Sequence, residues 1–114
     1  MEKPTPMINS AMLAQHAGQT VRIVGKVQKL TGQTLLIQTS DMGNVEVALN
    51  PDSEISGSTF VEITGKVSEG GSGLDGHLVR EFTTVDCGEN VDMELVEKTV
   101  QLSNKFPNLF SDST

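Results

Sequence analysis

The sequence reads Val21-Arg-Ile-Val-Gly25-Lys-Val27 and, further along, Val61-Glu-Ile-Thr-Gly65-Lys-Val67. In both stretches apolar and polar residues roughly alternate, as in a half-buried β-strand, and a glycine stands at the same place. A strand that bends sharply at a barrel corner favours glycine in mid-strand, because no side chain crowds the bend. The first and fourth strands of a five-stranded Greek-key barrel both bend in this way and lie next to each other. The echo therefore predicts two neighbouring strands of one small barrel.

Three further strands are expected around these two. Turn residues separate five runs that read as strands. The runs cover residues 20–30, 34–39, 45–49, 59–67 and 77–85. Five short strands at this spacing predict an all-β fold with an appended helix, in which the strands form a five-stranded Greek-key barrel of the OB type.

The expected organisation of the chain has four parts. Residues 1–9, with Pro4 and Pro6, are interpreted as a flexible lead-in. Residues 10–88 form the barrel, preceded by a short helix with Ser10 as its N-cap and Gly18 just past its end. Residues 89–106 form a C-terminal helix that Asn90 or Asp92 caps and Pro107 ends, and residues 107–114 are a tail.

The composition limits what such a barrel can do. The chain has 114 residues, which suits one domain, with 8 Lys and Arg against 15 Asp and Glu and a net charge of −7. Its only aromatic residues are four phenylalanines. An acidic chain with few rings for stacking is poorly suited to hold a polyanion by itself. No apolar run approaches the roughly 20 residues that cross a bilayer, and the single Cys87 cannot form an internal disulfide, so we expect a soluble intracellular protein that binds no membrane.

The C-terminal segment has the period of an α-helix. Counted at about 100° per residue, six polar residues, Glu94 and Glu97 among them, share an arc of about 120° that we assign to solvent. Apolar and small residues fill about 180° on the other side, more than the roughly 100° that packing on its own barrel requires. They are Met93, Leu95, Val96, Thr99, Val100, Leu102, Ser103 and Phe106. Either this helix merely caps the bottom of the barrel, or its wide face also meets partner helices.

The order and spacing of these segments resemble the smallest subunit of replication protein A, a eukaryotic heterotrimer that binds single-stranded DNA. The resemblance covers most of residues 8–110. It rests on Ile8-Asn-Ser-Ala-Met-Leu-Ala-Gln15, the two glycine-containing strands, Glu54-Ile-Ser-Gly57 and the helix that closes on Phe106-Pro107. It implies a single OB barrel whose C-terminal helix joins one helix from each of the middle and large subunits in a three-helix trimerisation core. Met93, Val96, Val100, Ser103 and Phe106 would then look toward these partners, in a nuclear complex for DNA replication, repair and recombination.

Arg22, Lys26 and Lys29 are the densest basic cluster and the weak candidates for direct contact with nucleic acid. Each neutralised phosphate adds only about 0.7 to 0.9 to the salt dependence of binding, so three or four charges make a weak site. A solvated flank of the barrel is the competing interpretation. The glycine-rich loop 68–76 holds two acids and no base, and we interpret it as a plain hairpin connection.

No residue pattern indicates catalysis, a metal or a cofactor. His16 and His77 are far apart in the sequence, and Cys87 lacks a CxxC partner. We therefore expect a non-enzymatic assembly subunit whose contact with single-stranded DNA comes mainly through its partners. The alternative is an autonomous OB-fold binder of single-stranded nucleic acid. A module for a peptide or sugar is a third possibility that no residue favours.

Overall fold

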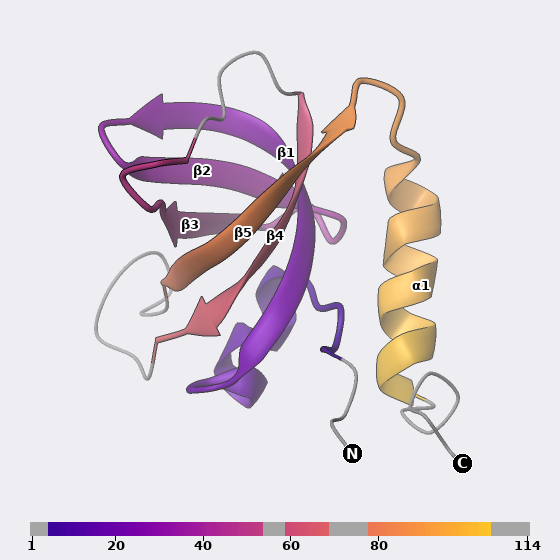
Figure 1. Ribbon diagram of the computed structural model, residues 1–114. Coiled ribbons are helices and arrows are strands. Elements are labelled where there is room, and N and C mark those ends of the chain that lie inside the picture. The colour runs from indigo at the N-terminus through magenta and orange to yellow at the C-terminus, as the bar shows by residue number, and fades with distance from the viewer. Residues whose placement is uncertain (1–4, 54–58, 69–77, 106–114) are drawn as a thin grey trace.

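A closed five-stranded barrel with one helix beside it forms the molecule (Figure 1). The computed structural model describes residues 5–53, 59–68 and 78–105, the last three by their backbone alone. A 3-10 helix, η1 (Ser10–His16), comes first, and an α-helix, α1 (Met93–Lys105), comes last. The strands between them are β1 (Thr20–Thr31), β2 (Thr34–Thr39), β3 (Asn44–Ala48), β4 (Phe60–Val67) and β5 (Val79–Gly88). Their order around the barrel is β1-β2-β3-β5-β4, with β3 and β5 parallel, so the predicted OB-type fold is confirmed.

The two glycine-containing strands are neighbours, as the echo predicts. In the antiparallel pairing of β1 with β4, Val21 lies opposite Gly65 and Gly25 lies opposite Val61. Gly25 also lies opposite Thr39 of β2, so it stands where β1 passes from one partner strand to the other. A Cβ atom at Gly25 would come within 2.8 Å of the Ile37 side chain, and one at Gly65 within 2.3 Å of a backbone carbonyl oxygen of β5. Both glycines therefore serve close approach between neighbouring strands.

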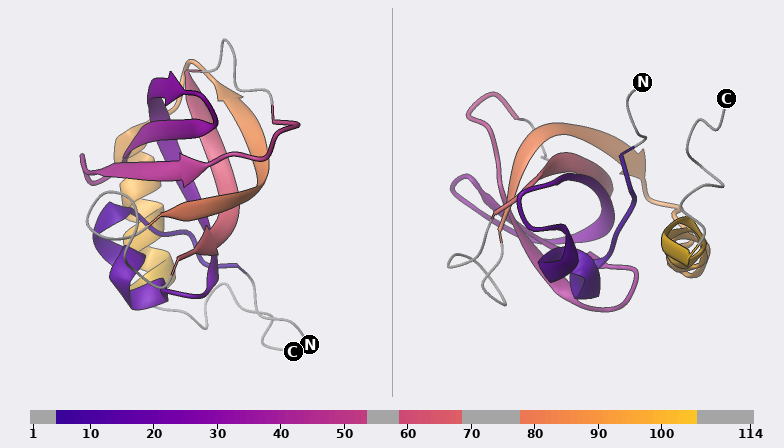
Figure 2. Two further views of the ribbon diagram at one scale, coloured as in Figure 1. Left: turned by 90° about the vertical axis from the view of Figure 1, so that its left-hand side faces the viewer. Right: turned by 90° about the horizontal axis from the view of Figure 1, so that it is seen from below.

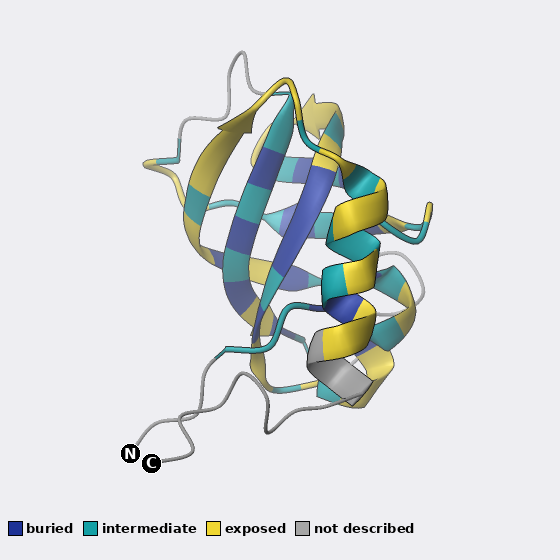
Figure 3. Ribbon diagram, turned by 90° about the vertical axis from the view of Figure 1, so that its right-hand side faces the viewer, coloured by how far each residue is buried: buried dark blue, intermediate teal, exposed yellow. Residues whose placement is uncertain are grey.

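The barrel core is built from aliphatic side chains at alternate strand positions. Figure 3 shows buried positions alternating with more exposed ones along the strands. The cluster consists of Ile8, Leu13, Val21, Ile23, Leu35, Ile37, Val45, Val47, Val61, Ile63, Val67 and Val79. Leu13 comes from η1 and is 3 % exposed, so η1 covers one end of the barrel. None of the described helices is long and apolar enough to span a lipid bilayer.

Residues 5–9 are part of the fold, which corrects the predicted flexible lead-in. The N–H of Ile8 donates to the carbonyl of Arg22 at 2.9 Å, and the N–H of Arg22 donates to the carbonyl of Pro6 at 2.8 Å. This segment lies along β1 before β1 begins to pair with β2. Ile8 is 1 % exposed. Proline predicts a break because it lacks an N–H, but this pairing needs only the carbonyl of Pro6.

The short predicted helix is present with a different start. It is a 3-10 helix that follows Asn9, and Ser10 is its first residue rather than its N-cap. The Ser10 hydroxyl instead donates to Asp41 at 2.8 Å. Gly18 has φ of 79°, the left-handed conformation expected of a glycine just past a helix.

Candidate interaction face of the C-terminal helix

The start of α1 is fixed by Asp92. Its carboxylate accepts hydrogen bonds from the backbone N–H groups of Glu94 at 3.0 Å and Leu95 at 3.2 Å. Of the two caps that the sequence allows, the structure thus selects Asp92 over Asn90. The negative charge of Glu94 in the first turn also suits the positive end of the helix dipole.

One face of α1 packs on its own chain. Figures 1 and 2 show the helix standing alongside the barrel, next to the N-terminal segment, rather than across the end that η1 covers. Val100 is 0 % exposed, and Met93 and Val96 are half-buried. These three residues form the inward face. The interpretation of α1 as a cap on the bottom of the barrel is therefore wrong, although the helix does pack against its own chain.

Glu97 also lies on the inward side, which corrects its predicted place on the solvent face. Its carboxylate accepts hydrogen bonds from Asn9 Nδ2 at 3.0 and 3.1 Å, from the Ser40 hydroxyl at 2.7 Å and from Gln101 Nε2 at 2.6 Å. Four residues after Met93 and three before Val100, it shares their face. Amphipathic spacing assigns a glutamate to solvent, because the spacing contains no information about hydrogen-bond donors elsewhere in the chain.

Hydrogen bonding lowers the pKa of Glu97. Burial and the neighbouring charge of Asp41 raise the pKa of Glu97, but the hydrogen bonds from Gln101, Ser40 and Asn9 outweigh them and hold the pKa below its ordinary value. Asn9 is 2 % exposed, and among the described residues its Oδ1 has no hydrogen-bond partner. The described contacts of the Asn9 amide are therefore those that Nδ2 makes with Glu97.

A second apolar face of α1 stays uncovered. Leu95 is 60 % exposed, Leu102 is 41 % exposed, and Thr99 is half-buried between them. The Thr99 hydroxyl donates to the carbonyl of Leu95 at 2.9 Å, so it needs no partner outside the helix. These three residues form the outward face, centred about 130° around the helix from the inward face. Figure 3 shows exposed positions along this side of α1.

The structure thus divides the predicted interface residues. Leu95, Thr99 and Leu102 point away from the barrel, whereas the three residues of the inward face are packed against their own chain. The side chain of Ser103 and the whole of Phe106 lie outside the described residues.

The turn between β2 and β3 joins η1 to the barrel beside α1. Asp41 accepts hydrogen bonds from the Ser10 hydroxyl at 2.8 Å, from the N–H of Ala11 at 3.1 Å and from the Thr39 hydroxyl. Burial raises the pKa of Asp41, but these hydrogen bonds lower it by more, so the net shift of the pKa is downward. A Cβ atom at Gly43 would come within 1.9 Å of Ser10 Oγ, so glycine permits this approach. No local sequence pattern indicates these contacts, because their residues come from two distant segments of the chain.

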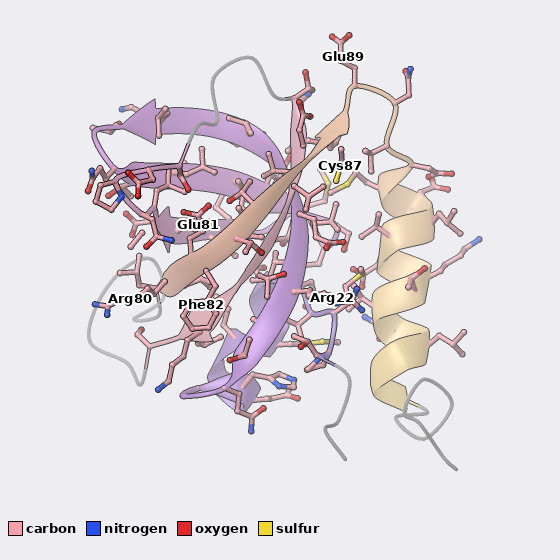
Figure 4. The ribbon with its side chains drawn as sticks, in the orientation of Figure 1. Arg22, Arg80, Glu81, Phe82, Cys87 and Glu89 are labelled. Atoms are coloured by element: carbon pink, nitrogen blue, oxygen red, sulfur yellow. The ribbon has the colours of Figure 1, made fainter. Side chains whose placement is uncertain are left out.

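The three basic candidates do not form one patch. Lys26 and Lys29 are exposed, whereas Arg22 is half-buried and its Nε donates to the backbone carbonyl of Thr5 at 3.2 Å. Figure 4 places Arg22 between β1 and α1. At about 3.3 Å per residue, Lys26 and Lys29 lie roughly 13 and 23 Å along β1 from Arg22. Such spacing spreads the charge along the strand instead of concentrating it.

A hollow of about 450 Å³ lies where the β3–β4 connection meets β5. Glu81, 2 % exposed, accepts hydrogen bonds there from the N–H of Asn50 at 2.8 Å and from the hydroxyls of Ser53 and Thr84. Burial raises the pKa of Glu81, but these hydrogen bonds outweigh that effect and hold the pKa below its ordinary value. Its neighbours Arg80 and Phe82 on β5 are exposed (Figure 4). Glu81 therefore joins the connection to the strand.

Cys87 does not have the environment of a reactive thiol. Burial and the negative charges of Glu62 and Asp86 raise the pKa of Cys87. Asp86 is the chain neighbour of Cys87, whereas Glu62 comes from β4, which pairs with β5. Within the part of the chain that the structure describes, no three His, Cys, Asp or Glu side chains are grouped to hold a metal ion.

Comparisons with known proteins place these features in a family. Residues 1–110 match the family model of replication factor A protein 3. The curated replication factor A protein 3 of Schizosaccharomyces pombe is 34 % identical over 110 residues, covering 96 % of this chain and 98 % of that protein.

Solved structures agree with this match. A chain in the structure of Ustilago maydis replication protein A bound to single-stranded DNA is 59 % identical, with a TM-score of 0.88 over 98 % of this chain and 100 % of that one. A chain of the S. pombe Stn1–Ten1 complex shares the fold alone, at 17 % identity and a TM-score of 0.69 over 92 % of this chain and 96 % of that one.

Proposed function

Since the chain belongs to the replication factor A protein 3 family, we propose that it is the assembly subunit of a replication protein A heterotrimer that binds single-stranded DNA. In this proposal α1 joins one helix from each of the middle and large subunits in a three-helix trimerisation core. The complex acts in the nucleus, in DNA replication, repair and recombination. Membership of this family also agrees with the expectation that the chain is not an enzyme.

The outward face of α1 is the observation that carries the proposal. Leu95 and Leu102 remain 60 % and 41 % exposed after the helix has packed on its own barrel. A helix whose wide apolar arc is only partly covered by its own barrel can contact the barrel and other helices at the same time. Ser103 and Phe106 follow at helical spacing and are proposed to extend the same contact.

The proposal assigns DNA affinity mainly to the partners. The chain carries a net charge of −7, and β2 and β3, the strands that OB barrels commonly use for nucleic acid, contain no aromatic residue. Base stacking on aromatic rings supplies about 1–3 kcal/mol per base in single-stranded binders, and these strands cannot supply it. Arg22, Lys26 and Lys29 are weak candidates for contact with nucleic acid, and the assembly role does not require them to touch DNA.

Co-expression with the middle and large subunits tests the assembly role. Leu95→Asp places a charge on the outward face, and aspartate is compatible with the first turn of a helix. We expect this variant to lose co-purification of both partners. Leu30→Asp is the matched control, because Leu30 on β1 is 48 % exposed and undergoes the same chemical change away from α1. Intact heterotrimer with Leu95→Asp would contradict the proposal.

Binding by the isolated chain tests the alternative, an autonomous binder of single-stranded nucleic acid. A purified chain that binds an oligonucleotide tightly at physiological salt would favour that alternative. Absence of measurable binding, together with DNA binding by the heterotrimer, is the result that the assembly role requires.

A further inference from the structure

We propose that Glu97 is a positioning residue that fixes the rotation of α1 about its own axis, so that Leu95, Thr99 and Leu102 face outward. This inference rests on the proposed function only for the identity of the partner helices that contact the outward face. The orientation of the helix is a property of the isolated chain.

Apolar burial alone does not explain the observed rotation. The inward face buries Val100 and partly buries Val96, while the leucines at 95 and 102 remain exposed. A leucine removes more apolar surface from water than a valine, so burial alone would favour turning the leucines toward the barrel. The hydrophobic effect is also non-directional and does not fix one rotation within a wide apolar arc. A directional interaction must therefore select the rotation.

The hydrogen bonds of Glu97 supply that direction. Asn9 Nδ2 bonds both carboxylate oxygens, at 3.0 and 3.1 Å, and the Ser40 hydroxyl bonds one of them at 2.7 Å. These donors come from two segments that lie 88 and 57 residues away in the chain. Any rotation that turned Glu97 away would leave the amide of Asn9, which is 2 % exposed, without its acceptor. A buried donor without an acceptor is costly, so these bonds favour one rotation.

Both donors are held by the barrel itself. Asn9 follows Ile8, whose backbone N–H donates to β1 at 2.9 Å. Ser40 lies in the β2–β3 turn, where its neighbour Asp41 is bonded to Ser10 at 2.8 Å. The carboxylate of Glu97 thus bonds the helix to two fixed positions on the barrel, Asn9 and Ser40. Glu97 faces its own chain and acts on the interface only through the orientation of Leu95 and Leu102.

Thiol labelling of the isolated full chain tests the inference. In a Cys87→Ser background, a reporter is introduced as Val100→Cys on the inward face or as Leu102→Cys on the outward face. The measured quantity is the labelling rate of the outward reporter divided by that of the inward reporter. Glu97→Ala, which removes the carboxylate without adding a large apolar side chain, should lower this ratio at least about fivefold, the population change that corresponds to about 1 kcal/mol, the usual net value of one hydrogen bond.

Matched variants separate positioning from helix stability. Glu94→Ala makes the same substitution at an exposed position of the same helix and should leave the ratio unchanged. Ser40→Ala removes one donor without altering the helix and should lower the ratio in the same direction, so it tests the inference even where Glu97→Ala folds poorly. Glu97→Gln should keep the ratio within about twofold, because its carbonyl still accepts and its amide can donate to Asn9 Oδ1.

Three results would overturn the inference: an unchanged ratio in both Glu97→Ala and Ser40→Ala, an equal fall in Glu94→Ala, or a fall in Glu97→Gln as large as in Glu97→Ala. Failure of the proposed function is a different result, in which Leu95→Asp leaves the heterotrimer intact. The labelling ratio is measured on the isolated chain, so it still tests the orientation of α1 in that case.

Discussion

Glu81 on β5 accepts a 2.8 Å hydrogen bond from the backbone N–H of Asn50, 31 residues earlier in the chain. The Asn50 side chain returns a bond, since its Nδ2 donates to the carbonyl of Glu81 at 3.0 Å. This reciprocal pair fixes the β3–β4 connection to β5 close to the point where β3 and β5 make their short parallel contact. A buried carboxylate is therefore part of how the barrel closes.

Glu81→Ala should destabilise the barrel. The substitution leaves the N–H of Asn50 and the hydroxyls of Ser53 and Thr84 without their shared acceptor. We expect the free energy of unfolding to fall by about 2–4 kcal/mol, measured by urea denaturation of the isolated chain. Glu89→Ala is the control, because Glu89 is exposed beyond β5, and it should change the free energy by no more than about 0.5 kcal/mol. An equal effect of the two variants would show that the Glu81 contacts do not stabilise the fold.

Stability should fall in acid. Asp41, Glu81 and Glu97 each have a pKa below the ordinary value, because hydrogen bonds to the carboxylate outweigh the effect of burial. The unfolded chain then binds more protons than the folded chain near the ordinary carboxyl pKa values of about 4. The stabilisation is complete above that range and is lost as pH falls through the lower, folded values.

Urea denaturation at a series of pH values between about 7 and 2 checks this sign. We expect the free energy of unfolding to begin to fall near pH 5 and to continue falling below pH 4. Glu81→Gln cannot titrate at that position, so it should reduce the pH dependence while lowering stability at neutral pH. Constant or rising stability toward pH 3 would contradict the assignment.

The barrel could be predicted from the sequence because its signals are local. Each signal extends over only a few positions: the alternation in the strands, the corresponding glycines at 25 and 65, and the turn residues between the runs. The predicted neighbourhood of β1 and β4 is confirmed by the pairing of Val21 with Gly65. Local chemistry also limits the cap of α1 to Asn90 or Asp92, and the hydrogen bonds of Asp92 decide between them.

The contacts that orient α1 could not be predicted in this way. Glu97 has the spacing of a solvent-facing residue, and its donors Asn9 and Ser40 come from segments far away in the chain. No periodic pattern in the helix shows that the buried amide of Asn9 needs a hydrogen-bond acceptor. The flexible lead-in predicted at residues 5–9 is wrong for a related reason, because the prolines indicate a break locally while the carbonyl of Pro6 pairs with β1.

Gly25→Ala should destabilise the barrel through its contact with β2. The added Cβ atom would lie 2.8 Å from both Cβ and Cδ1 of Ile37, so the core must shift to accept it. Overpacking of this kind costs about 1–3 kcal/mol, measurable as a lower urea midpoint. Ile37→Val removes Cδ1, so the double variant should be less destabilised than the sum of the two single variants. Strict additivity would mean that this contact is not the cause.

Alanine at Lys26 and Lys29 should leave DNA binding by the heterotrimer nearly unchanged. The two side chains are exposed but lie apart along β1, on a chain with a net charge of −7, and the proposed function assigns DNA affinity to the partners. The measurement is the affinity of wild-type and doubly substituted heterotrimers for one oligonucleotide at several salt concentrations. A lysine that neutralises a phosphate contributes about 0.7 to the slope of log affinity against log salt. Equal slopes are expected, because neither lysine then makes such a contact. A slope smaller by about 1.4 would place both lysines on DNA and would favour a direct binding role for this barrel.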